Sequence, residues 1–260
     1  MRLDEMRPRI IERLKSIEQS EAIKIVLAVE SGSRGWGFAS KDSDWDVRFL
    51  YVRSYEWYLS IDDGRDTLEY PETAQLDVCG WDIKKALRLF RKSNPPLLEW
   101  LRSPIMYLEQ TSAARRMRDI SAHYFHPRSC IHHYLHMAAG NFREYLRGDF
   151  VKVKKYFYVL RPVLACQWIM RTNTMAPMEF EQLLDTQIAN GILRADIDEL
   201  LARKRNGDEL DRGPLIRSLN DFLEEQIAFF EDYVKKKDKH SKPDTERLDV
   251  LFRDTLQEAW

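Results

Sequence analysis

The sequence predicts a protein of two lobes, a mixed α/β lobe over residues 1–110 and an all-α lobe over residues 111–260. Short apolar and β-branched runs at 23–29, 46–52 and 73–81 are typical of strands and occur only in the first part of the chain. In the second part the apolar residues recur at helical spacing instead. Charged residues reach 32% and glycine is scarce, which favours a helix-rich chain.

The first lobe begins with a helix and a buried strand. Residues 4–20 place apolar side chains at helical spacing among charges of both signs, which predicts an amphipathic helix rather than a signal peptide. The run IKIVLAV at 23–29 is almost wholly apolar, which is typical of a buried strand. A Gly-Ser turn, Gly32 and Ser33, follows this strand.

Two further strands of the first lobe carry aspartates. The run DVRFLYV at 46–52 predicts a strand with alternate apolar side chains on one face. The run TAQLDVCGW at 73–81 predicts another strand, in which Asp77 lies on the face opposite Val78. Asp82 is expected to cap the helix that follows.

The second lobe is predicted to be helical throughout. Residues 128–148 form one long helix in this prediction, which ends at a glycine. Residues 151–172 form another, and Pro162 inside it is expected to bend the helix. Three or four more helices are expected over 177–258, where the polar stretch 235–240 is typical of a linker.

Composition excludes some classes of protein. No apolar run approaches the roughly 20 residues of a membrane span, so we expect no membrane partner. The three cysteines are widely spaced, fit no disulfide framework and favour a cytoplasmic location. A net charge of −1 excludes a global basic footprint, yet residues 111–180 hold 11 Lys and Arg against 4 Asp and Glu. This block is either a surface for triphosphate or nucleic acid, or a pair of helices with solvated cations.

Asp44 and Asp46 are two residues apart at the start of a strand, so their side chains share a face. Two adjacent carboxylates repel each other unless a cation lies between them, and Mg²⁺ accepts one or two carboxylates together with phosphate oxygens. Asp77, on a strand expected to lie alongside, would be a third ligand, and Asp82 is its rival. Backbone N–H groups and the Ser33 hydroxyl could hold a phosphate. The alternative for Asp44 and Asp46 is ordinary turn chemistry.

These motifs resemble those of the DNA polymerase β-like nucleotidyltransferase superfamily, and most closely the YcgL/RlaP-type predicted nucleotidyltransferases, which are named for association with RNA repair ligases. The resemblance covers about residues 25–170. It is carried by ESGSRGWGFASKDSDWDVRFLYV (30–52), EWYLSI (56–61), GWDIKKALRLFRKSNPPLLEWLRSP (80–104) and VKKYFYVLRPVLACQWI (153–169).

The resemblance implies a fold and an activity. The fold would be a polymerase β-like mixed sheet with helices, followed by a helical domain. The activity would be transfer of NMP from an NTP, with Mg²⁺ or Mn²⁺, to a hydroxyl such as that of an RNA end. Carried over to this sequence, Ser33 and its neighbour Gly32 would bind the triphosphate, Asp44 and Asp46 would hold both metal ions, and Asp77 would hold the catalytic one.

A basic stripe in the second lobe is a further candidate. Lys154, Tyr158 and Arg161 fall at i, i+4 and i+7 of the 151–172 helix and could clamp the nucleotide, or form a solvated stripe. Arg34, beside the Gly-Ser turn, could reach phosphate or pair with an acid.

Three alternatives stay open. Trp36 and Phe38 could stack a base or belong to the core. His132 and His136 have the spacing of a helical metal pair but lack an obvious third ligand. The acceptor could instead be a protein or a small molecule, or the chain could be a nucleotide-binding regulator without activity.

Overall fold

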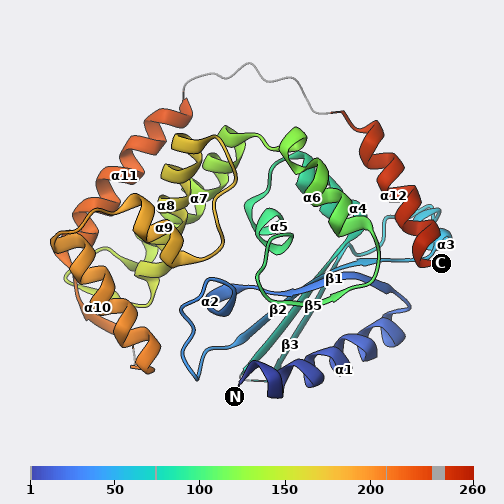
Figure 1. Cartoon of the computed structure of the whole chain (residues 1–260), viewed down its shortest axis with the longest axis horizontal. Helices are drawn as coiled ribbons and strands as arrows, with labels where there is room; N and C mark the ends of the chain where they lie inside the picture. The colour runs from blue at the N-terminus through green and yellow to red at the C-terminus, as the bar shows by residue number, and fades with distance from the viewer. Residues whose placement is uncertain (1, 74, 209, 236–243) are drawn as a thin grey trace.

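The computed structural model describes residues 2–73, 75–208, 210–235 and 244–260. These residues form two lobes, one around a five-stranded sheet and one of helices (Figure 1). No helix in these ranges has the length and apolar character that a membrane crossing requires. Most of the predicted polar linker lies in 236–243, outside the described residues.

The sheet is mixed and has the strand order β3-β4-β2-β1-β5. Its strands are β1 (Lys24–Glu30), β2 (Trp45–Val52), β3 (Thr67–Thr73), β4 (Leu76–Asp82) and β5 (Met106–Glu109). Strands β2 and β4 are parallel, and the other neighbours are antiparallel. The parallel register places Asp46 directly beside Asp77, as the sequence predicts for strands that lie alongside each other.

Each face of the sheet has its own cover. Helix α1 (Leu3–Glu21) lies on one side, and α4 (Ile83–Arg91) and α6 (Ala113–Tyr124) lie on the other (Figure 1). Alternate apolar residues of β2 (Val47, Phe49, Tyr51) pack with α1, which confirms the predicted face. Asp82 caps α4 by accepting a hydrogen bond of 2.8 Å from the Lys84 N–H, which is also as predicted.

The second lobe is mainly helical but not wholly so. Its helices are α7 (Pro127–Tyr145), α8 (Lys155–Thr172), α9 (Phe180–Gln187), α10 (Ile192–Asn206) and α11 (Arg217–Lys235). Two short strands, β6 (Phe150–Lys152) and β7 (Arg212–Pro214), pair with each other, so the prediction of an all-α lobe was wrong here. In β6 the alternation of buried Val151 with exposed neighbours suits a strand, and the predicted helix therefore begins only at Lys155.

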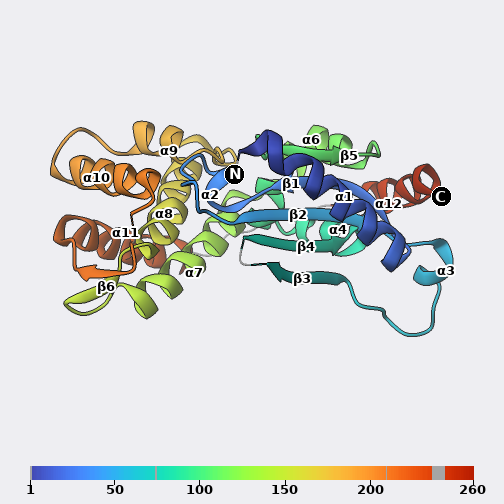
Figure 2. The ribbon, with the colours of Figure 1, turned by 90° about the horizontal axis from the view of Figure 1, so that it is seen from below.

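The packing does not divide at residue 110. Helix α6 packs on the sheet lobe, and the last helix, α12 (Glu246–Ala259), returns to pack on α4, α6 and β2 (Figure 2). Leu248, Leu251 and Leu256 of α12 are buried in the cluster that also holds residues of β1 and α8. One continuous core therefore joins the lobes. The remaining short helices, α2 (Gly32–Gly35), α3 (Tyr55–Tyr58) and α5 (Pro95–Trp100), all belong to the sheet side.

Candidate active site

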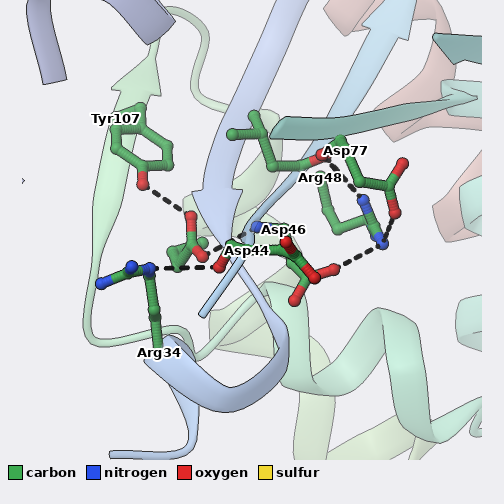
Figure 3. A network of polar contacts seen from close by, with 8 residues as sticks. Arg34, Asp44, Asp46, Arg48, Asp77 and Tyr107 are labelled. Carbon is green, nitrogen blue, oxygen red and sulfur yellow. Dashed lines mark hydrogen bonds and ion pairs between the residues drawn. The ribbon is translucent and has the colours of Figure 1, made fainter. Parts of the chain in front are cut away.

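Two of the three predicted aspartates meet on a single cationic nitrogen. Nη2 of Arg48 lies 3.2 Å from a carboxylate oxygen of Asp46 and 2.7 Å from one of Asp77 (Figure 3). Arg48 also donates to the backbone carbonyls of Val47 and Asp77. The two carboxylates are thus close enough to share one cation, which in this structure is the guanidinium.

Arg48 is a site residue that the sequence reasoning missed. It follows Asp46 by two positions on β2, so both side chains lie on the same face of the sheet. The alternation Asp44, Asp46, Arg48 was the available signal. Only the register of β2 against β4 shows that the arginine reaches both carboxylates.

Asp44 contributes charge to this cluster without joining it. Burial raises the pKa of Asp46, and the nearby carboxylates of Asp77 and Asp44 raise it further, while Arg48 opposes the rise. Among the residues that the structure describes, no three His, Cys, Asp or Glu side chains lie together as a metal-binding group. The predicted convergence of three acids is therefore seen for Asp46 and Asp77, with exposed Asp44 as an electrostatic neighbour.

The Gly-Ser turn packs directly against the Asp46 carboxylate. Gly32 has a φ of +55°, and a Cβ built on it would lie 1.9 Å from an Asp46 carboxylate oxygen. The Ser31 N–H donates a hydrogen bond of 2.8 Å to the Asp46 carbonyl. Only glycine allows both this backbone conformation and this close approach. The Gly32–Ser33 turn and Asp46 therefore form one structural unit, although they are more than ten residues apart in the sequence. Ser33 lies in the first turn of α2.

The buried carboxylate of Glu30 supports this unit through the backbone of Asp46. Glu30 is fully buried, and its carboxylate accepts hydrogen bonds from the Asp46 N–H (2.9 Å) and from the Tyr107 hydroxyl (2.6 Å). Burial raises the pKa of Glu30 to about 7. The sequence analysis did not predict Glu30 as a site residue. The available signal was an acid at the end of an otherwise apolar strand.

Arg34 is engaged with the loop that carries Asp44. It donates to the carbonyls of Asp44 (3.1 Å) and Ser43 (2.6 Å), and its guanidinium carbon lies 3.8 Å from the centre of the Trp45 ring. These contacts fix the entry to β2, and Figure 3 shows how Arg34 lies beside Asp44. Its predicted contact with phosphate stays a prediction.

Two lysines of the helical lobe face the same loop. Lys154, exposed and next to the first residue of α8, is close enough to Asp46 to lower the pKa of that carboxyl. Lys204 of α10, which the sequence reasoning missed, donates to the Ser43 hydroxyl at 3.3 Å. Burial lowers the pKa of Lys204, and the neighbouring Lys154 lowers it further. Positive charge from the second lobe is therefore concentrated beside the aspartates.

Tyr158 and Arg161 line a cavity of about 530 Å³ together with Asp77. Burial raises the pKa of Tyr158, as do the charges of Asp46 and Asp44. Arg161 is buried in an ion pair with Glu99 (2.7 Å) and donates to the Met178 carbonyl. The alternative of a solvated basic stripe is therefore excluded at Arg161, whose guanidinium is buried among protein groups. The predicted contact of Arg161 with nucleotide stays a prediction.

The structure assigns the other residues that the sequence left open to different places. Phe38 is buried and stacks on Phe157 at 5.0 Å, whereas Trp36 lines the cavity. Asp82 caps α4 and lies five residues beyond Asp77 on β4, roughly 16 Å away at the usual strand rise. The rings of His132 and His136 lie 4.5 Å apart, outside any three-residue metal group of the described chain.

Comparison with known proteins agrees with the resemblance seen in the sequence. Residues 6–254 match the model of RlaP, the RNA repair pathway DNA polymerase beta family. Uncharacterized protein YcgL of Bacillus subtilis (strain 168) is 48% identical over 255 residues, which cover 98% of each chain.

A solved structure gives a weaker likeness. The nucleotidyltransferase-like protein from Exiguobacterium sibiricum 255-15 aligns over 93% of this chain and 87% of that one, with 11% identity. Its TM-score of 0.29 is too low to support an argument about the fold. The family match over nearly the whole chain decides the assignment: this protein belongs to the RNA repair pathway DNA polymerase beta family, RlaP.

Proposed function

We propose that this protein transfers NMP from a nucleoside triphosphate to a hydroxyl group at an RNA end, with Mg²⁺ or Mn²⁺ as cofactor. The observation that carries the proposal is the meeting of Asp46 and Asp77 on one cationic nitrogen, against the Gly32–Ser33 turn. A scaffold does not require a left-handed glycine so close to a carboxylate that a Cβ would lie 1.9 Å from its oxygen.

The donor set suits a divalent ion. Asp46 and Asp77 would hold it, with Asp44 beside them and phosphate oxygens completing its coordination. When bound, such ions neutralise charge on the attacking and leaving oxygens of an in-line displacement. Arg48 supplies one positive charge to two carboxylates, which leaves an excess of negative charge for a further cation to compensate.

The chain's own residues divide the remaining work. Asp77 is the most exposed of the paired acids and lines the cavity, so it is placed to accept the proton of an acceptor hydroxyl. Ser33, Lys154 and Lys204 would hold the triphosphate, since Lys154 acts on the Asp46 charge and Lys204 reaches Ser43 beside Asp44. Glu30 and Tyr107 position Asp46 through its backbone.

The test is an incubation with each labelled NTP and Mg²⁺, with and without RNA that carries a free terminal hydroxyl. Label on RNA supports the proposal, and Asp77→Asn should remove it. Label on protein would favour protein nucleotidylation instead, and label on a small molecule would favour an acceptor of that kind. Bound nucleotide without any transfer would favour a regulator and sink the proposal.

A further inference from the structure

A second cavity, of about 440 Å³, has a strongly basic lining. It lies between the end of α4 and the start of α7, and none of the described residues that line it is acidic. Its cationic and imidazole side chains are Arg91, Lys92, His126, Arg128, His132 and His133. We call this cavity the basic groove.

The charges of the basic groove are held in place by neutral partners. Arg91 donates to the Thr245 hydroxyl and Arg128 to the Tyr233 carbonyl, both at 2.6 Å. A guanidinium has five N–H donors, and a bond to one neutral oxygen uses only one of them. Burial lowers the pKa of His133, and its neighbours His132, His136 and Lys92 lower it further, so these side chains lie close together.

The basic groove and the cavity at Asp77 share the same two walls. The end of α4 and the residue after it supply Arg91 and Lys92 to the groove, and α5 then supplies Pro96, Glu99 and Trp100 to the cavity. Helix α7 supplies its residues in the same order: Ser129, His132 and His133 line the groove, and Met137 and Asn141 line the cavity.

One face of α7 connects the two. His133, Met137 and Asn141 fall at i, i+4 and i+8, so they form a stripe about 12 Å long at the helical rise. Met137 is 42% exposed on this stripe, and a Cβ added to Gly140 would meet nothing within 4 Å. The helix surface between the groove and the cavity is therefore accessible at Met137 and uncrowded at Gly140.

We propose that single-stranded RNA lies along α7, with its terminal nucleoside in the cavity at Asp77 and its upstream phosphates in the basic groove. The inference rests on the proposed function and adds where the acceptor strand binds. Phosphodiesters match the groove because lysine and arginine neutralise phosphates without reading sequence. The cavity offers Trp81 and Trp100, whose rings lie 3.9 Å apart, and Trp36, as apolar surface for a base.

The test measures binding of a fluorescent oligouridylate by anisotropy, without nucleotide and with EDTA, so that a failure of transfer and a failure of RNA binding are separate results. Lys92→Glu should weaken binding by roughly tenfold and lower the salt dependence of log K by about 1. Its matched control is Lys15→Glu, the same charge change on the exposed side of α1, which should leave the Kd within about twofold.

A second pair of variants tests the course along α7. Met137→Glu should weaken RNA binding by several-fold, because the new carboxylate repels the phosphates of the strand at close range. Met170→Glu, on α8 and also 42% exposed, is its control. Equal affinities within either pair, no measurable binding of RNA, or tighter binding of an oligodeoxythymidylate than of the RNA would each overturn the proposal.

Discussion

Two arginine–carboxylate clusters contribute to the same cavity and differ in their access to water. Arg161 and Glu99 have side chains only 2% and 8% exposed, and the Tyr134 hydroxyl also donates to Glu99. Arg48 is 18% exposed, and its partners Asp46 and Asp77 are 27% and 53% exposed. The first, which we call the closed cluster, joins the two lobes. The second, which we call the open cluster, is accessible to solvent.

The charge balance of the clusters differs as well. Glu99 and Arg161 neutralise each other, and the Trp36 ring covers the guanidinium at 4.7 Å. Around Arg48, two carboxylates share one guanidinium. An arginine beside an acid can therefore have two uses. A buried pair whose charges balance stabilises the packing of the elements that carry it. A solvent-accessible cluster with excess negative charge can bind another cation.

The largest effect is expected when the open cluster loses a carboxylate. Asp46→Asn keeps the shape of the side chain but removes the charge that a divalent ion needs, so the transfer rate should fall by roughly 10²–10³-fold or more. The melting temperature without metal should hold or rise slightly, because burial disfavours the Asp46 charge. Stabilisation by Mg²⁺-NTP should shrink. A mutant that transfers at nearly the wild-type rate would reduce the Asp-x-Asp motif to turn chemistry.

The closed cluster should respond through stability instead. Arg161→Met leaves Glu99 buried without its cation, which should lower the free energy of unfolding by about 3–5 kcal/mol. Urea denaturation at neutral pH measures the loss. As a control, Arg161→Met/Glu99→Leu removes both charges and should recover most of it. No destabilisation in the single variant would show that this pair is as dispensable as a surface pair.

The third prediction concerns the support beneath the open cluster. Because burial raises the pKa of Glu30 from 4.5 to about 7, the folded state keeps a proton there that the unfolded state has lost. Unfolding free energy should therefore fall as pH rises from about 4.5 to about 7, by up to about 3 kcal/mol, and stay level above that. In Glu30→Gln this slope should be clearly smaller, with the buried Asp46 and Asp82 contributing the remainder, while Glu12→Gln, an exposed change on α1, should keep it. If the free energy of unfolding depended on pH in the same way in all three proteins, Glu30 would not be the source of the slope.

The smallest change in stability is expected at Arg48. Arg48→Met removes a partly exposed pair and should cost less than about 1 kcal/mol without metal. It also removes the cation that competes for Asp46 and Asp77, so in the presence of NTP the Mg²⁺ concentration that gives half of the thermal stabilisation should fall by a few-fold. A rise in that concentration would mean that Arg48 assists metal binding rather than competing with it.

Local pattern was enough to predict the parts of the fold that are local. The strands at β1, β2 and β4, the cap at Asp82 and the side on which Asp77 lies all follow from alternation and capping rules, and the structure agrees. Strands β3, β5, β6 and β7 and the return of α12 were missed, because edge strands, short strand pairs and helix docking depend on partners far away in the sequence.

The site was predictable to the same extent. Asp46 and Asp77 were found from their spacing, but Arg48, Glu30 and Lys204 become site residues only through strand register and lobe packing. Arg161 shows a further limit. Helix α8 is buried nearly all round, so helical periodicity gives a common face for Lys154 and Arg161 but not which end of that face meets solvent.

The return of α12 makes the sheet lobe discontinuous in sequence, because its core combines residues that precede α7 with residues of Glu246–Ala259. Leu248, Leu251 and Leu256 enter that core only after every helix of the second lobe has been synthesised. The sheet lobe therefore cannot complete its packing as an independent N-terminal unit, and the two lobes finish folding together.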